Sequence, residues 1–270
     1  MYFTNLPCTS DNLELYLCSC FSRGLTCGTI RSAVSAISFY HKMNDFPDPA
    51  RTYRITRLLR GIGKNTKSRR KLLPISFGLL QKLLDNLGII CDYYDRACLR
   101  AVLLALYYGC MRVGELVKSG TDRHMLMLHN VQFLFAGPVL GGVRFTLASY
   151  KHADEPATFK IKGSGSDNCP VMALLEFCKL RGVRPGPVFV KKNGKEYSRD
   201  FIAKSLKTMI GRVGLDPKHF NTHSFRIGRA SDLAFQGVAE QVIKKTGRWE
   251  SNAYTRYIRF DDFTVPSPVV

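Results

Sequence analysis

The sequence predicts a mainly α-helical protein with a small antiparallel β-sheet, an α+β fold in two domains. Most of the 270 residues lie in segments whose apolar side chains recur at three- and four-residue steps, as one face of an α-helix requires. Only within residues 131–162 do apolar and polar side chains alternate, or β-branched and aromatic residues gather, as is typical of β-strands. A polar, glycine-bearing and basic stretch at 61–74 is typical of a linker, and we place the domain boundary near residue 68.

The first domain, residues 1–68, is expected to be helical. Residues 11–21 form one candidate helix, and residues 29–43 form a stronger one because their apolar side chains fall on a single face. A break with two prolines follows, and residues 51–59 form a short basic helix that should end at Gly61.

The second domain, residues 69–270, is expected to begin with helices, pass through three strands and return to helices. The expected helices are 76–87, 95–108, 112–118, 171–180, 198–213, 222–235, 239–245 and a last one that holds Tyr254 and Tyr257. The expected strands are 131–135, 143–150 and 157–162, with turns at Gly141-Gly142 and at residues 152–156.

The charge balance favours a polyanionic partner. Lys and Arg number 40 against 21 Asp and Glu, which gives a formal net charge of +19. Nucleic acid is the commonest partner of such a protein, and a merely solvated basic surface is the alternative. A membrane surface is not expected as a partner, because the sequence has no long basic amphipathic helix with bulky apolar residues on its other face. A membrane span is not expected either, because the longest apolar stretch, residues 101–111, is far shorter than the ~20 residues that span a bilayer.

The cysteines indicate a reducing compartment. Their number is nine, which is odd, and they are scattered along the chain. The closest pair, Cys18 and Cys20, has a spacing unsuited to a zinc knuckle. We therefore expect neither disulfides nor a structural zinc ion. The N-terminus also lacks the basic and apolar regions of a signal peptide.

The linker carries the candidate DNA-binding cations. Like charges keep such a segment extended until a polyanion neutralises them. The residues concerned are Lys64, Lys67, Arg69, Arg70 and Lys71. An ordinary solvated linker and a nuclear-import signal are the alternatives.

Two arginines and a histidine have the chemistry to hold a phosphodiester during cleavage. Nucleophilic attack on the phosphorus adds negative charge to the non-bridging oxygens, and a guanidinium can donate to two of them at once. Arg112 and Arg226 are the candidates, and His223 lies three positions before Arg226 at an expected helix start capped by Asn221 or Thr222. Taken singly, each has a plainer explanation, such as an ion pair between Arg112 and Glu115.

Tyr257 is the candidate nucleophile. A phenol has a pKa near 10 and needs activation, which flanking Arg256 and Arg259 would favour. Tyr254, one helical turn earlier, is the alternative. Trp249, the single tryptophan, would donate its indole N–H to a phosphate oxygen while its ring packs against the site, although taken alone a buried core tryptophan is the more favoured explanation.

The leaving 5′ oxygen needs a proton, which a lysine on the sheet would supply. Lys151 at the end of the second strand is the first candidate, and Lys160 and Lys162 on the third are competitors. No HExxH motif, carboxylate pair or phosphate-binding glycine loop is present in the sequence. We therefore expect cleavage without a metal ion or other cofactor.

These segments resemble the signature boxes of the tyrosine recombinases, the phage-integrase family. Residues 109–116 (Gly-Cys-Met-Arg-Val-Gly-Glu-Leu) resemble the first arginine box, and residues 222–226 (Thr-His-Ser-Phe-Arg) resemble the second. Residues 246–249 resemble the box that carries His or Trp, and Tyr257 followed by Ile-Arg resembles the nucleophile position. Lys151 falls where the family places its β-hairpin lysine. The amino-acid sequences of the last boxes are most similar to those of recombinases of DIRS- or Crypton-type eukaryotic mobile elements.

The resemblance implies a clamp around double-stranded DNA. Residues 1–68 would be a truncated, SAM-like core-binding domain, and residues 69–270 the catalytic domain. Family members form a 3′-phosphotyrosyl bond, release a 5′ hydroxyl, need no ATP and act as tetramers on DNA. Glu115 would orient the first box. A eukaryotic source would place the protein in the nucleus, and any other source in the cytoplasm.

Three features depart from the family pattern. The N-terminal domain is short, which affects the expected DNA affinity. Trp249 precedes Tyr257 by eight positions, one fewer than in bacterial members, so Tyr254 stays a candidate. Arg248 stands where a small residue is usual. A type IB topoisomerase and a catalytically silent, transposon-derived DNA-binding protein are the rival functions.

Overall fold

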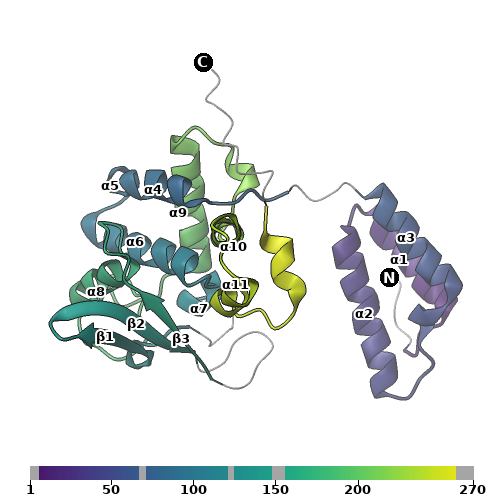
Figure 1. Ribbon diagram of the computed structural model, residues 1–270. Coiled ribbons are helices and arrows are strands. Elements are labelled where there is room, and N and C mark those ends of the chain that lie inside the picture. Colours follow the sequence, from purple (N-terminus) through teal and green to yellow (C-terminus); the bar gives the residue numbers. More distant parts are fainter. Residues whose placement is uncertain (1–5, 67–70, 121–124, 148–155, 260–270) are drawn as a thin grey trace. The chain divides into compact units, whose positions relative to one another are not determined.

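The computed structural model describes residues 6–66, 71–120, 125–147 and 156–259. The chain divides into two compact units, Met1–Arg70 and Lys71–Val270, each with its own hydrophobic core (Figure 1).

The first unit is a small bundle of helices. Its elements are α1 (Ser10–Ser22), α2 (Cys27–Met43), the 3₁₀ turn η1 (Pro49–Arg51) and α3 (Tyr53–Asn65). Threonine side chains cap the three α-helices by accepting backbone N–H groups, at Thr9, Thr26 and Thr52. The apolar faces meet in a core built around Leu13, Leu17, Ile30, Val34 and Ile55. The helical periodicity of this region therefore corresponds to one buried face on each helix.

Helix α3 is longer than the sequence predicted. It continues through Gly61 to Asn65, so the first residues of the expected linker are helical. The reason is packing, because Ile62 is buried in the core of the unit and offsets the low helix propensity of glycine. Lys64 consequently lies on the last turn of α3.

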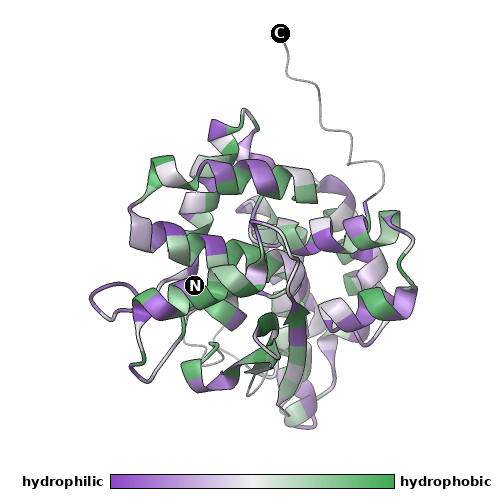
Figure 2. Cartoon of the chain, turned by 60° about the vertical axis from the view of Figure 1, so that its left-hand side comes forward, coloured by the Kyte–Doolittle hydropathy of each residue, from purple (hydrophilic) through white to green (hydrophobic). Residues whose placement is uncertain are grey.

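The second unit surrounds one buried helix. Its α-helices are α4 (Phe77–Asp85), α5 (Leu87–Ile90), α6 (Tyr93–Tyr108), α7 (Val113–Leu116), α8 (Pro170–Arg181), α9 (Arg199–Arg212), α10 (Ser224–Phe235) and α11 (Glu240–Gly247). Three 3₁₀ turns accompany them, η2 (Leu128–Asn130), η3 (Pro217–His219) and η4 (Asn252–Tyr257). Helix α6 is buried along most of its length and packs against α8 and α10. Figure 2 shows hydrophobic and hydrophilic segments alternating along the helices, the pattern of helices with one buried and one solvated face.

The sheet is a three-stranded antiparallel meander in the order β1-β2-β3. Its strands are β1 (Val131–Ala136), β2 (Val139–Leu147) and β3 (Ala157–Lys162). Val143 on β2 pairs with Ile161 on β3, and both are buried. Because side chains alternate along a strand, Lys160 and Lys162 on either side of Ile161 are exposed. The sheet thus presents two lysines on the face opposite its core.

The mainly α fold with a small antiparallel sheet confirms the predicted fold class. Several boundaries were wrong. Gly141 and Gly142 lie inside β2, and the first hairpin turns at residues 137–138 instead, where Gly137 has a φ of 60° that glycine adopts freely. The last expected helix is the 3₁₀ turn η4, and no helix in the described ranges is long and apolar enough to cross a membrane.

Helix α10 is held against the start of the second unit by close backbone contact. The N–H of Ile75 donates to the carbonyl of Ser224 at 3.0 Å. A Cβ on Gly228 would lie 1.8 Å from the carbonyl oxygen of Ile75, so only glycine fits at this position. This contact fixes the helix that carries the second arginine box.

Candidate active site

The start of α10 presents His223 and Arg226. The Asn221 side chain accepts the backbone N–H of His223 at 2.7 Å in the turn before α10. The helix itself has His223 at its N-cap and no side-chain cap, so the expected capping by Asn221 or Thr222 was wrong. The helix begins at Ser224, which leaves His223 at the N-cap position instead of inside the helix. His223 is exposed on part of its surface, while protein atoms cover the rest of its imidazole. Arg226 on the first turn points into the protein.

Arg226 is fixed from several sides. Its side chain is buried, with 1% of the residue exposed, and donates to the carbonyl of Cys110 and to the carbonyl of Gly247 at 3.1 Å. Its guanidinium carbon lies 4.9 Å from the centre of the Trp249 ring and 5.6 Å from that of Tyr257. A buried charge held this way keeps its position without reorganisation when a negative charge develops nearby.

The turn between α6 and α7 supplies Arg112. Cys110 adopts a left-handed backbone conformation with a φ of 44°, and its carbonyl accepts from Arg226. Two residues later, Arg112 donates from its backbone N–H and its guanidinium to the carboxylate of Glu115, at 2.9 and 3.1 Å. The Arg112 side chain keeps 31% of its surface exposed, so its other donors can reach a ligand.

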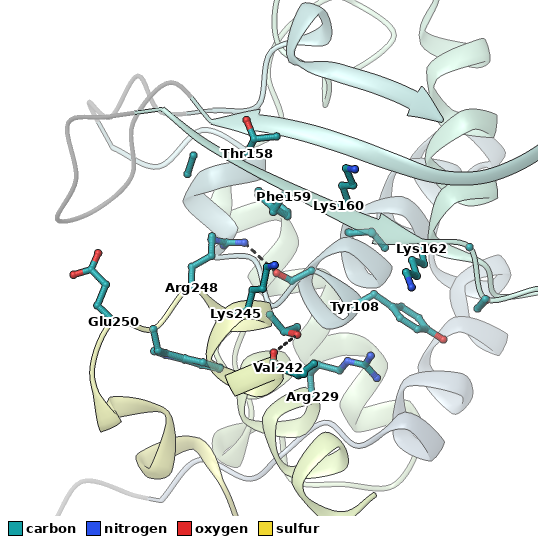
Figure 3. A pocket seen from close by; sticks show the side chains of 17 residues that line it. Tyr108, Thr158, Phe159, Lys160, Lys162, Arg229, Val242, Lys245, Arg248 and Glu250 are labelled. Carbon is teal, nitrogen blue, oxygen red and sulfur yellow. Dashed lines mark hydrogen bonds between the residues drawn. The ribbon is translucent and has the colours of Figure 1, made fainter. Parts of the chain in front are cut away.

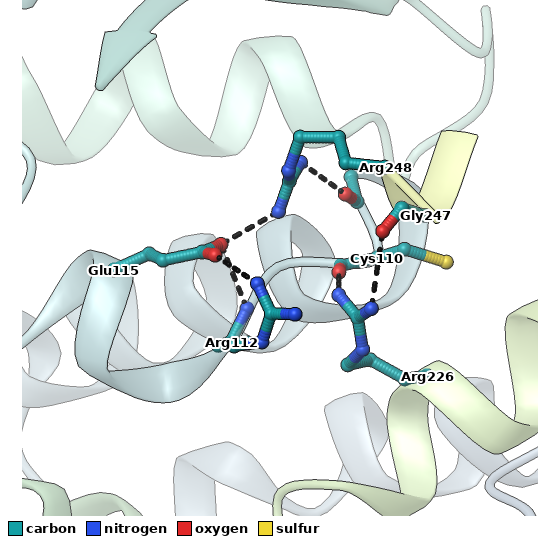
Figure 4. Close-up of polar contacts among 7 residues, drawn as sticks. Cys110, Arg112, Glu115, Arg226, Gly247 and Arg248 are labelled. Carbon is teal, nitrogen blue, oxygen red and sulfur yellow. Dashed lines mark hydrogen bonds and ion pairs between the residues drawn. The ribbon is translucent and has the colours of Figure 1, made fainter. Parts of the chain in front are cut away.

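Arg248 joins the same carboxylate from the other side (Figure 4). Its guanidinium donates to Glu115 at 2.6 Å and to the carbonyl of Gly109 at 3.3 Å. The guanidinium carbon also lies 4.3 Å from the centre of the Phe159 ring. Glu115 therefore forms ion pairs with two arginines, Arg112 and Arg248, that lie far apart in the sequence.

Gly247 lets Trp249 fold back against α11. A Cβ on Gly247 would lie 1.9 Å from a carbon of the Trp249 ring, so the position accepts glycine alone in this arrangement. The indole Nε1 of Trp249 is buried and donates no hydrogen bond within the part of the chain that the structure describes. The ring itself packs 4.9 Å from the centre of the Tyr257 ring. Of the two roles expected for Trp249, packing against the site is the one this arrangement displays.

Tyr257 closes the site at the end of η4. Its ring centre lies 5.0 Å from that of His223. The hydroxyl of Ser231 on α10 donates to the carbonyl of Tyr257 at 3.1 Å and accepts the N–H of Arg259 at 2.9 Å, which fastens this segment. Tyr254 is 3% exposed in a small core cluster with Ile243, so its side chain faces away from solvent.

The electrostatics of the site favour an anion. Surrounding protein atoms desolvate the imidazole, and the charges of Arg226 and Arg112 repel a proton from it, which together lower the pKa of His223 to about 4. The imidazole is therefore neutral at pH 7 in the free protein. The same positive field would attract a phosphate group.

A basic pocket of about 1040 Å³ adjoins this cluster between β3 and α11. Figure 3 shows Lys160 and Lys162 projecting from β3, with Lys245 and Arg248 on the facing segments. Lys151 lies outside the described residues, so its expected role stays a prediction. Lys160 and Lys162 border the site and remain candidates for the same role.

The structure brings together most of the predicted site. The residues that converge are Arg112, Glu115, His223, Arg226, Trp249 and Tyr257. Of the basic linker, Lys64 and Lys71 are described, while Lys67, Arg69 and Arg70 lie outside the described residues. Among the described residues, no group of His, Cys, Asp and Glu is arranged to hold a metal ion.

Sequence reasoning did not identify two residues that organise the site. Arg248 was noted only as a departure from the family pattern, and its contact with Glu115 spans 133 positions of the chain. Nothing in the sequence around Ser231 indicated a role in the site, apart from its place on α10, the helix that also carries Arg226. Both act through contacts that no local spacing reveals.

Solved structures of tyrosine recombinases are similar to this chain in fold. The XerH site-specific recombinase bound to a palindromic difH substrate has a TM-score of 0.64 at 18% identity, over 94% of this chain and 70% of XerH. The Tn1549 transposon integrase in complex with circular intermediate DNA has a TM-score of 0.60 at 16% identity, over 95% and 83%. A lambda integrase dimer bound to a core site has a TM-score of 0.59 at 14% identity, over 98% and 68%. No protein-family model and no curated protein matches the sequence.

The chain therefore has the tyrosine recombinase fold, and the resemblance read from its boxes is confirmed at the level of the fold. The closer similarity to DIRS- or Crypton-type elements stays a prediction.

Proposed function

We propose that this protein is a site-specific DNA recombinase or integrase that cuts and rejoins DNA through a 3′-phosphotyrosyl intermediate. The observation that carries the proposal is the convergence of Arg112, His223, Arg226 and Tyr257 in one cationic site, although they come from distant parts of the chain. The fold shared with DNA-bound recombinases and integrases supports the same conclusion.

In the proposed reaction, Arg112 and Arg226 bind the non-bridging oxygens of the scissile phosphate. Their charges oppose the negative charge that develops during attack. Tyr257 loses its hydroxyl proton to solvent, and the phenolate oxygen bonds to phosphorus while the bond from phosphorus to the 5′ oxygen breaks. His223 holds the phosphate, and Lys151 gives a proton to the leaving oxygen. The products are a 3′-phosphotyrosyl bond and a free 5′ hydroxyl, whose return attack reverses the step without ATP.

Several parts of the proposal concern assembly. We propose double-stranded DNA as the partner and a homotetramer as the working form, with the helical first unit and the basic segment at 64–71 gripping the duplex. The net charge of +19 supports binding to a polyanion. Nuclear localisation stays a prediction.

The test uses nicked duplexes of randomised sequence as suicide substrates. A nick close to the cleavage point lets the short fragment that bears the 5′ hydroxyl diffuse away, so the covalent complex accumulates and survives denaturing electrophoresis. We expect the wild-type protein to form an adduct, Tyr254→Phe to retain it, and Tyr257→Phe to lose it while binding DNA as tightly as the wild type.

Each rival function gives a different result. A catalytically silent DNA-binding protein would shift DNA in native gels and form no adduct with any substrate in the pool. A type IB topoisomerase would form the adduct and relax supercoiled plasmid as a monomer, without recombinant products. An adduct that persists in Tyr257→Phe would contradict the assignment of the nucleophile.

A further inference from the structure

Arg248 occupies an unusual position in the site. It ends α11 in a left-handed backbone conformation, with a φ of 55° that side chains other than glycine rarely adopt. Its side chain is only 9% exposed, although it carries a full charge. A buried arginine in a strained conformation calls for a specific partner, and that partner is Glu115.

Glu115 creates an electrostatic problem for phosphate binding. Its carboxylate lies 3.1 Å from the guanidinium of Arg112, and its side chain is 5% exposed, so solvent screens the pair weakly. On its own, the pair Arg112–Glu115 has no net charge. A phosphate approaching Arg112 would meet the repulsion of the carboxylate as well as the attraction of the guanidinium.

Arg248 removes this problem. It approaches Glu115 more closely than Arg112 does, at 2.6 Å, and gives the group of three a net charge of +1. The same short turn also serves Arg226, because the carbonyl of the preceding Gly247 accepts from that guanidinium. One turn of the chain therefore contacts Arg226 directly and Arg112 through its partner Glu115.

We infer that Arg248 is a positioning residue for the cleavage site: it neutralises Glu115 and thereby leaves the charge of Arg112 available to the scissile phosphate. This inference rests on the proposed function of the same site. It assigns Arg248 no direct contact with DNA, because the two terminal nitrogens of its guanidinium donate to Glu115 and to the carbonyl of Gly109, and Glu115 is the group whose charge it compensates.

The experiment measures phosphate binding directly. Trp249 is the single tryptophan in the chain, and its ring contacts both Arg226 and Tyr257, so its fluorescence reports on the site. Inorganic phosphate is titrated at constant ionic strength into the wild type, Arg248→Met, Arg248→Lys, Glu115→Gln and the double variant Glu115→Gln/Arg248→Met. Thermal unfolding of each variant shows which of them are folded.

Charge compensation predicts a specific pattern. Arg248→Met should weaken phosphate binding about tenfold, the effect of one uncompensated charge a few ångströms from the ligand. Arg248→Lys, which keeps the charge, should stay within about threefold of the wild type. The double variant has the same net charge around Arg112 as the wild type and should bind phosphate as the wild type does.

Two results would overturn the inference. If the double variant binds as weakly as Arg248→Met, Arg248 itself contacts the phosphate; if Arg248→Met binds like the wild type, its charge is irrelevant. Should Arg248→Met fail to fold, the double variant still tests the first case by comparison with the wild type. Glu115→Gln tests the second, because compensation predicts tighter phosphate binding once the carboxylate is removed, and an irrelevant charge predicts no change. The readout is independent of cleavage, so a protein that binds phosphate as predicted but forms no tyrosyl adduct would refute the proposed function and leave this inference standing.

Discussion

The two sides of the candidate site are built in opposite ways. On the α10 side, Arg226 is 1% exposed and is held by two carbonyl oxygens and two aromatic rings. On the β3 side, Lys160 and Lys162 project from a strand into a wide basic pocket and are exposed. The difference indicates that the two sides have different roles. A fixed guanidinium can stabilise charge that develops at one point, whereas a flexible ammonium can follow a moving ligand or deliver a proton.

Replacement of Arg226 on the fixed side should have the largest effect. Arg226→Lys replaces the two terminal nitrogens of a planar guanidinium by a single ammonium nitrogen that cannot occupy both of their positions, so we expect it to lose adduct formation and about 2–4 kcal/mol of unfolding free energy. Suicide-substrate trapping and denaturant unfolding measure the two effects. Arg256→Lys on the exposed part of η4 is the matched control and should change neither. A stable, active Arg226→Lys would mean that this side is not rigid.

Gly247→Ala should have the next largest effect. Its new methyl group would lie 1.9 Å from the Trp249 ring, so the ring must leave its place beside Arg226 and Tyr257. We expect a loss of about 1–3 kcal/mol in unfolding free energy, together with much slower cleavage. Gly78→Ala on α4, where nothing lies within 4 Å of the added carbon, should be neutral or slightly stabilising. Equal behaviour of the two variants would contradict this packing.

His223 should make stability depend on pH. Its folded-state pKa of about 4 lies below the ordinary value of 6.5, so between these values the unfolded chain binds more protons than the folded one. The contribution of His223 to stability is therefore complete above pH 6.5 and is lost as the pH falls toward 4. NMR titration of the imidazole and unfolding of His223→Gln, which should lack this pH dependence, measure the effect. An imidazole that titrates near 6.5 in the folded protein would show that the positive field is weaker than described.

Changes on the β3 side should affect stability least. Lys160→Ala and Lys162→Ala remove exposed side chains, so we expect unfolding free energies within about 0.5 kcal/mol of the wild type. If each lysine neutralises a DNA phosphate, the slope of log affinity against log salt should fall by about 1 per variant. Lys179→Ala at an exposed position of α8 is the control and should keep the wild-type slope. Strong destabilisation by either β3 variant would remove the contrast between the two sides.

The sequence was sufficient to predict the fold class and much of the site, and the reasons differ for the two. Helical periodicity reflects burial of one face, so α6 and α10 were found close to their observed limits. Turn residues misled where packing overrides local preference: Gly61 continues α3 because Ile62 is buried, and Gly142 lies inside β2. Local residue types favour a turn at certain positions, but burial of neighbouring side chains in the core determines whether the turn forms there.

The site residues were identified because their types and order are characteristic of the family, as with Arg112 and Tyr257. Their supporting contacts could not be identified in the same way. The clasp of Arg248 on Glu115 depends on the left-handed turn after α11 and on the path of the chain between the two residues. Ser231 is recognisable only when the backbone of Tyr257 is seen beside it.

The most direct test of the account is to identify the residue that becomes attached to DNA. The covalent complex trapped on a nicked duplex is digested with nuclease and protease, and the peptide that carries the residual nucleotide is sequenced by mass spectrometry. The convergent site predicts a single modified residue, Tyr257. Attachment at Tyr254 or at any other residue, or the absence of a modified peptide from folded, DNA-bound protein, would contradict it.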